Sequence, residues 1–195
     1  MFKVHDAYFH PSDPIKKVLR LTNSDKVIYI SRHPCDVLVS VAQYMKLSIL
    51  EAFRLLSAQN ATLSSSRISG LPQVRQYLGP WDFHVQSWCN NMPSGFLQTS
   101  YEALYNSRYH EFGRIFKYIY GVSDYNLVAS ALNLISFNQL ESNEKSFNNS
   151  SSESVHFGRR MFWGGVPGSG AKLIDKEIYR RTVSIFKETL DTLGY

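Results

Sequence analysis

The stretch from Lys26 to Ser40 limits the folds open to this chain more than any other part of it. It begins with residues 27–30, a short run of β-branched and aromatic side chains that is typical of a buried strand. It continues through a polar turn into an apolar helical pattern. Pro34 stands where the first helical turn begins, which suits its fixed φ and missing N–H. The order strand, turn, helix predicts an α/β fold with a parallel sheet flanked by helices.

Two polar side chains in this stretch form a candidate anion site. Arg32 falls at the carboxyl end of the predicted strand, and Ser40 falls about two turns into the predicted helix. Ligands of open α/β sheets bind at the carboxyl ends of the strands. An Arg fork and a Ser hydroxyl suit a phosphate group. Taken alone, the pair is equally compatible with a purely structural role.

The same stretch resembles the 3′-phosphate-binding motif of sulfotransferases that use 3′-phosphoadenosine 5′-phosphosulfate (PAPS). The family pattern, a strand followed by Arg-x-Pro-x-Asp-Val-x-Val-Ser, reads here as Arg32-His-Pro34-Cys-Asp36-Val37-Leu-Val39-Ser40. The resemblance implies a P-loop-NTPase-like three-layer sandwich, in which a small parallel sheet is flanked by helices. It also implies that Arg32 and Ser40 bind the 3′-phosphate.

The remaining patterns predict one α/β domain over residues 1–195. We expect strands at residues 2–9 and 96–99, and helices at 34–46, 49–60, 107–120, 124–135 and 175–192. The chain has no Lys/Arg run typical of a nucleic-acid-binding arm, no apolar stretch of membrane-spanning length and no signal peptide. Its two cysteines are too few for a disulfide framework or a zinc site. We therefore expect a cytoplasmic protein without a metal, a nucleic-acid partner or a membrane span.

A Lys and a His near the chain start are candidate catalytic residues. Lys3 and His5 are two positions apart on a predicted strand, so their side chains would share a face. Taken alone, the pattern is more often explained by two polar residues on a solvated strand face. Sulfotransferases carry a similar Lys-x-His strand shortly before the Arg…Ser motif. The resemblance implies that His5 is the general base and that Lys3 stabilises the sulfuryl group during transfer.

Two further segments resemble the family's adenine-binding residues. Residues 96–104 look like a strand followed by Tyr-Glu-Asp-Leu, with Ala103 in place of the Asp. Residues 135–141 are similar to the family segment Thr-Ser-Phe-x-x-Leu/Met. The resemblance implies that Tyr101, Phe137 and Ser136 hold the adenine. A tyrosine at a strand end, taken alone, is more often part of the core or its rim.

A Gly-rich segment resembles the family's Arg-Lys-Gly-x-x-Gly-x-Trp loop, which covers the 3′-phosphate. Trp163-Gly164 stands in place of the Arg-Lys pair before Gly165, and Gly170 in place of the Trp. Arg159 and Arg160 lie just upstream, so which Arg serves the loop stays open. Backbone amides of such a turn can bind phosphate. The resemblance implies that Arg159, Arg160 and Gly165 contribute to the cofactor site.

The segment from Gly79 to Trp88 is similar to the family's Gly-Ser-Trp-x-x-His-Val-x-x-Trp helix. Its tryptophans are expected in the core. His84 is expected to be structural, with no catalytic role.

One family feature is absent. Sulfotransferases begin with a phosphate-binding loop, Tyr-Pro-Lys-Ser-Gly-Thr-Thr-Trp, which binds the 5′-phosphosulfate, and nothing similar precedes Lys3. We therefore expect a domain that is N-terminally incomplete and lacks its first strand.

Three functions follow from these observations. The resemblance implies sulfuryl transfer from PAPS to a hydroxyl or amine of a small acceptor. The absent loop favours an alternative, a catalytically inactive nucleotide-binding or interaction protein derived from this fold. A small-molecule kinase is a third hypothesis, but the chain lacks Gly-x-x-x-x-Gly-Lys-Ser/Thr and a metal-binding Asp after a strand. The acceptor and the formation of a homodimer stay open.

Overall fold

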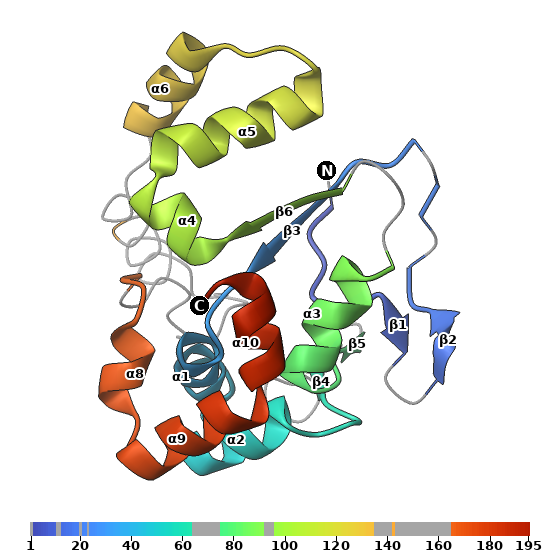
Figure 1. Ribbon diagram of the computed structural model, residues 1–195, viewed down its shortest axis with the longest axis vertical. Coiled ribbons are helices and arrows are strands. Elements are labelled where there is room, and N and C mark those ends of the chain that lie inside the picture. The colour runs from blue at the N-terminus through green and yellow to red at the C-terminus, as the bar shows by residue number, and fades with distance from the viewer. Residues whose placement is uncertain are drawn as a thin grey trace, which may run out of the picture.

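A computed structural model describes residues 2–10, 13–19, 21–22, 24–63, 75–91, 96–134, 142 and 165–195. Strands and helices alternate along these residues, as expected for the α/β class (Figure 1). The strands are β1 (Phe9–His10), β2 (Asp13–Lys17), β3 (Val27–Ser31), β4 (Thr62–Leu63), β5 (Gln76–Tyr77) and β6 (Phe96–Ser100). The helices are α1 (Pro34–Met45), α2 (Ile49–Leu56), α3 (Trp81–Cys89), α4 (Tyr101–Asn106), α5 (Arg108–Tyr120), α6 (Tyr125–Leu134), α8 (Ser169–Leu173), α9 (Lys176–Ile185) and α10 (Lys187–Leu193).

The central sheet consists of β3 and β6, which pair in parallel and in register. Val27 lies opposite Phe96 at one end of the ladder, and Ser31 lies opposite Ser100 at the other. Among the described residues, each of these strands pairs only with the other. Because the strands are parallel and of equal length, both end at the same edge of the sheet. The residues that follow them therefore emerge side by side.

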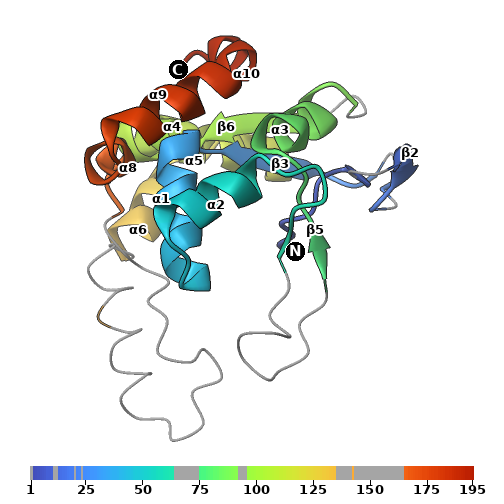
Figure 2. The ribbon, with the colours of Figure 1, turned by 90° about the horizontal axis from the view of Figure 1, so that it is seen from below.

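Helices cover both sides of this sheet. In Figure 1, β3 and β6 cross the molecule between the α5–α6 pair and a group that contains α1, α9 and α10. Figure 2 shows α1 and α2 next to each other, with α9 and α10 above them in the view. The fold is thus a small parallel sheet flanked by helices, and the predicted class is confirmed.

Two clusters of buried apolar side chains form the core. One joins α1, α2 and the segment from α8 to α9, and it includes Leu38, Phe53 and Ile178. The other joins α3 to α10 through Trp81 and Phe186. The Phe186 side chain is 1% exposed and lies between α9 and α10. The predicted single helix over 175–192 is therefore two helices, because the chain bends where Phe186 enters the core.

The ends of α1 match the local sequence. His33 Nδ1 accepts the N–H of Cys35, and Pro34 occupies the first turn, as predicted. The helix ends at Lys46 in the left-handed conformation, with φ 56°. Ser48 and Glu51 then form a reciprocal capping box that starts α2. The cap at His33 and Pro34 starts α1 directly after β3.

The strand predicted for residues 2–9 is largely wrong. Residues 2–7 have no regular secondary structure, and only Phe9–His10 form a strand. Lys3 and His5 therefore do not lie on a strand, so strand alternation gives no reason for their side chains to share a face. Backbone groups from His5 to Tyr8 bond instead to side chains of α3. One backbone bond also links the segment to β5, from the Ala7 N–H to the Tyr77 carbonyl at 2.7 Å. Side chains of α3 and this single bond therefore hold residues that form no strand ladder.

Candidate nucleotide-binding site

The in-register ends of the central strands bring Arg32 and Tyr101 together. Each residue directly follows its strand, after the paired positions Ser31 and Ser100. The Arg32 Cζ atom lies 4.2 Å from the centre of the Tyr101 ring. This stacking holds the guanidinium in a cation–π contact. The two residues predicted at strand ends thus share one site.

The Arg32 guanidinium is only partly satisfied. Its Nη2 atom lies 3.4 Å from Asp36 Oδ2, one helical turn away. Its Nε atom is buried and has no hydrogen-bond partner among the described residues. A buried donor without a partner is destabilising, and a cationic one more so. The Arg32 side chain as a whole is 23% exposed, so part of the cationic group can still be approached by an anion.

Asp36 connects this site to the Gly-rich segment. Its carboxylate is buried, with the residue 2% exposed. The Oδ2 atom accepts the Gly168 N–H at 2.9 Å, and Oδ1 accepts the Gly170 N–H at 2.6 Å. A Cβ on Gly170 would lie 2.4 Å from the Cys35 carbonyl oxygen. Only glycine permits this approach of the segment to α1.

Tyr101 holds an earlier residue of the same Gly-rich segment. Its hydroxyl donates to the Gly165 carbonyl at 2.7 Å. Burial raises the pKa of Tyr101, so this hydroxyl keeps its proton. The buried Gly165 is therefore fastened next to the tyrosine ring on which Arg32 stacks.

Glu102 fixes the turn between β3 and α1. Its Oε1 atom accepts the His33 N–H at 3.0 Å, and its Oε2 atom accepts the Tyr195 hydroxyl at 2.7 Å. The His33 and Tyr195 rings also meet edge to face, with centroids 5.3 Å apart. One carboxylate thus joins the ends of both strands to the last residue of the chain. Burial is the first cause that raises the pKa of Tyr195, followed by its bond to Glu102.

Sequence reasoning assigned no role to Asp36, Glu102 or Tyr195. Asp36 and Glu102 were visible in the quoted motifs, each close to a predicted ligand-binding residue. The signal that could have identified them was the position of each carboxylate. Asp36 lies one helical turn from Arg32, and Glu102 lies at the start of a helix. Tyr195 carried no such signal, because its partner is distant in sequence.

The structure describes only one of the other residues that we predicted to bind the cofactor through a side chain. Ser40 is exposed on α1, about two turns after its start. The four residues Ser136, Phe137, Arg159 and Arg160 lie outside the described residues. Their roles stay predictions.

Lys3 and His5 are both exposed on the irregular N-terminal segment. Partial burial is the first cause that lowers the pKa of His5, and the neighbouring Lys3 charge lowers it further. A lowered pKa leaves the imidazole neutral at neutral pH, which a general base requires. The carbonyl of His5 is held by His84.

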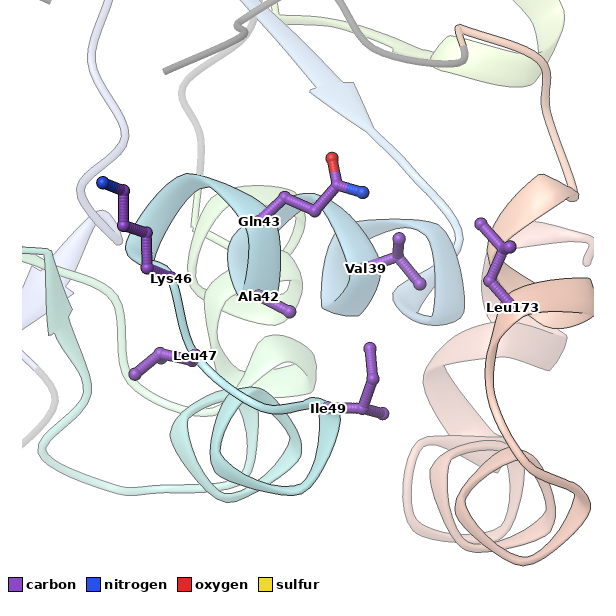
Figure 3. A pocket seen from close by; sticks show the side chains of 7 residues that line it. All are labelled: Val39, Ala42, Gln43, Lys46, Leu47, Ile49 and Leu173. Carbon is purple, nitrogen blue, oxygen red and sulfur yellow. The ribbon is translucent and has the colours of Figure 1, made fainter. Parts of the chain in front are cut away.

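An open hollow of about 450 Å³ lies beside α1 (Figure 3). Its lining is mostly apolar and consists of Val39, Ala42, Gln43, Lys46, Leu47, Ile49 and Leu173. Figure 3 shows Leu173 facing Val39 and Ile49 across the hollow. Neither Arg32 nor Tyr101 lines it, so the hollow is distinct from the arginine site.

No helix among the described residues is long and apolar enough to cross a membrane. The described residues also contain no group of three His, Cys, Asp or Glu side chains that could hold a metal ion.

The sequence profile of the sulfotransferase domain matches residues 10–194. The chain belongs to the sulfotransferase domain family. Solved structures similar to this sulfotransferase domain include mouse sulfotransferase SULT7A1 complexed with PAP, with a TM-score of 0.61 and 21% sequence identity. That match covers 85% of this chain and 58% of the SULT7A1 chain, so this domain spans less than two thirds of its structural relative. No curated protein matches the sequence.

Proposed function

We propose that this sulfotransferase domain binds PAPS and transfers its sulfuryl group to a hydroxyl or amine of a small acceptor. The observation that carries the proposal is the Arg32 guanidinium at the carboxyl edge of β3 and β6. It is stacked on Tyr101 and keeps a buried Nε–H without a partner among the described residues. Carboxyl edges of parallel strands are ligand sites, and a guanidinium fork matches phosphate oxygens. Family membership supports the same reading.

The residues around Arg32 fit the 3′-phosphate of such a nucleotide. Arg32 would supply the charged donor, and the exposed Ser40 hydroxyl on α1 would supply a neutral one. Tyr101 would contact the adenine, with Phe137 and Ser136 completing its pocket. Gly165 lies against Tyr101, so the Gly-rich segment starts at this site. Arg159 and Arg160 precede that segment and would add positive charge.

PAPS supplies an activated sulfuryl group when it is bound. The neutral His5 imidazole would take the proton of the acceptor hydroxyl or amine. Lys3, two residues away, would stabilise negative charge that develops during transfer.

The test is calorimetry with 3′-phosphoadenosine 5′-phosphate (PAP), followed by an assay with PAPS and 4-nitrophenol. We expect PAP binding and transfer to the phenol. Binding without transfer would favour the alternative, a nucleotide-binding protein that has lost catalysis. The absence of PAP binding by the folded chain would overturn the proposal.

A further inference from the structure

One face of α3 holds the segment that carries Lys3 and His5. His84 Nε2 lies 3.1 Å from the His5 carbonyl oxygen, and Trp88 Nε1 donates to the Asp6 carbonyl at 2.9 Å. Ser87 Oγ accepts the Tyr8 N–H at 3.1 Å. Ser87 and Trp88 lie three and four residues after His84, so each lies on the same side of the helix as His84. These three side chains bind a backbone segment whose one backbone bond to a strand runs, among the described residues, from the Ala7 N–H to the Tyr77 carbonyl of β5.

The chemistry of these contacts fixes the tautomer of His84. A backbone carbonyl only accepts hydrogen bonds, so the Nε2 atom must carry the hydrogen. Burial is the first cause that lowers the pKa of His84, which keeps the ring neutral at neutral pH. The Nδ1 atom then has no hydrogen and can only accept. It lies 3.0 Å from the Tyr29 hydroxyl oxygen.

Tyr29 supplies the matching donor. Burial raises the pKa of Tyr29 far above its usual value, so its hydroxyl stays protonated and donates to His84 Nδ1. The Tyr29 ring also stacks on His84 and Trp88, with centroids 5.9 Å and 6.0 Å away. Tyr29 lies on β3, the strand that ends at Arg32. A hydrogen-bond chain of fixed direction therefore runs from the central strand to the His5 backbone.

We propose that His84 is a positioning residue that fixes the His5 segment relative to β3 through its Nε2–H tautomer. The importance of this for catalysis rests on the proposed role of His5 as general base. Lys3 and Asp6 are the charged neighbours of His5, and Asp6 is also held by Trp88 and by the Tyr77 N–H. His84 adds the contact closest to the proposed base. The sequence pattern suggested only a structural histidine at this position.

The first test reads the tautomer directly by long-range ¹H–¹⁵N NMR of histidine-labelled full chain at pH 7.5. We expect His84 to be neutral, with hydrogen on Nε2 and not on Nδ1. A hydrogen on Nδ1, or a doubly protonated ring, would overturn the proposal. The measurement needs no variant and no nucleotide.

The second test compares His84→Gln with His84→Leu by amide hydrogen exchange and by NMR titration of the His5 ring. A glutamine can donate to the His5 carbonyl and accept from Tyr29, whereas leucine can do neither. We expect at least tenfold faster exchange in His84→Leu at Tyr8, whose N–H bonds to Ser87 on the same face of α3, with the pKa of His5 rising towards 6.5. His84→Gln should stay within about twofold of wild type. His110→Gln, on α5, serves as the control for loss of a histidine.

Unchanged exchange and an unchanged His5 titration in a folded His84→Leu chain would overturn the proposal. So would a His84→Gln chain that behaves like His84→Leu. PAP affinity should stay within twofold in both variants, because Arg32 is untouched. Failure of wild type to bind PAP would overturn the proposed function alone, since the tautomer and exchange results would still decide this inference.

Discussion

The arginine site and the His5 segment are held in place by different means. Backbone pairing of β3 with β6 places Arg32 beside Tyr101, and a buried carboxylate fastens the Gly-rich segment next to them. The His5 segment has no such ladder. It is held by single side chains of α3 and by isolated bonds to Tyr77 of β5. A ladder needs only backbone groups, so it tolerates many side chains. A segment held by side chains is sensitive to the identity of each one.

The two regions also differ in burial. Asp36 is 2% exposed, whereas His5 is exposed. Interactions made out of water are worth more, and removing one partner leaves the other unpaired. Tyr8 and Ser87, which hold the His5 segment, are buried as well, but their contact is neutral. We therefore expect a larger loss of stability from removing the buried charge of Asp36 than from removing a neutral contact of the His5 segment.

The largest effect is expected for Asp36→Ala. It removes a buried carboxylate that accepts two backbone N–H groups and lies near Arg32, so unfolding free energy should fall by about 3–5 kcal/mol. Urea denaturation measures this. Asp191→Ala is the control, because Asp191 pairs with Lys187 on the surface and its loss should change nothing measurable. Equal losses in both variants would contradict the assigned role of Asp36.

Gly170→Ala should be the next most damaging change. The new Cβ would lie 2.4 Å from the Cys35 carbonyl and 2.6 Å from Asp36 Oδ1, so α8 must move away from α1. Such overpacking costs about 1–3 kcal/mol, again measurable by urea denaturation. Gly121→Ala gives the opposite case, since Gly121 has φ 78° with no atom within 4 Å of its Cβ position, whereas Gly170 is crowded but not at positive φ. A Gly170→Ala chain as stable as wild type would refute the close approach.

Ser87→Ala probes the other region with a smaller effect. It leaves the buried Tyr8 N–H without its acceptor, which costs about 1–2 kcal/mol. Ser57→Ala is the control, because Ser57 only donates back to Phe53 within α2. The two stabilities are compared by urea denaturation. PAP affinity should not change in either variant, and its loss in Ser87→Ala would show that the two regions are coupled.

The last effect expected is a loss of stability in mild acid. Burial lowers the pKa values of His5, His33 and His84 below the unfolded value of 6.5. Stability from their neutral forms is present above pH 6.5 and is lost as pH falls, because the unfolded chain binds more protons. Each histidine that takes up a proton only on unfolding adds at most about 1.4 kcal/mol per pH unit to the slope of unfolding free energy against pH. Urea denaturation at pH 7.5 and 5.5 should show the loss, with a shallower slope in His84→Gln.

Much of this arrangement could be predicted from local sequence. The apolar run at 27–30 and Pro34 predicted β3 and the start of α1, because strand burial and helix initiation depend on neighbouring residues. Tyr101 was predicted at the end of the second strand, and the structure places it there. The stacking of Arg32 on Tyr101 needed the register of two strands that are far apart in the chain.

The predictions that failed depend on distant contacts. A strand was expected at residues 2–9, but a strand needs a continuous ladder, and this segment is held by α3 side chains and a single backbone bond to Tyr77 instead. The break at Phe186 likewise depends on a core built with α3. Asp36 was part of a recognised motif, yet its bonds to Gly168 and Gly170 could not be inferred from spacing.

The central claim is that Arg32 binds the 3′-phosphate of the nucleotide. Calorimetry with PAP and with adenosine 5′-monophosphate, which lacks that phosphate, tests it on wild type and Arg32→Ala. We expect wild type to prefer PAP by about 2–3 kcal/mol, roughly 30- to 150-fold, and Arg32→Ala to lose this preference. Arg181→Ala, which removes a guanidinium stacked on Phe53, should keep it. An undiminished preference for PAP in Arg32→Ala would contradict the account.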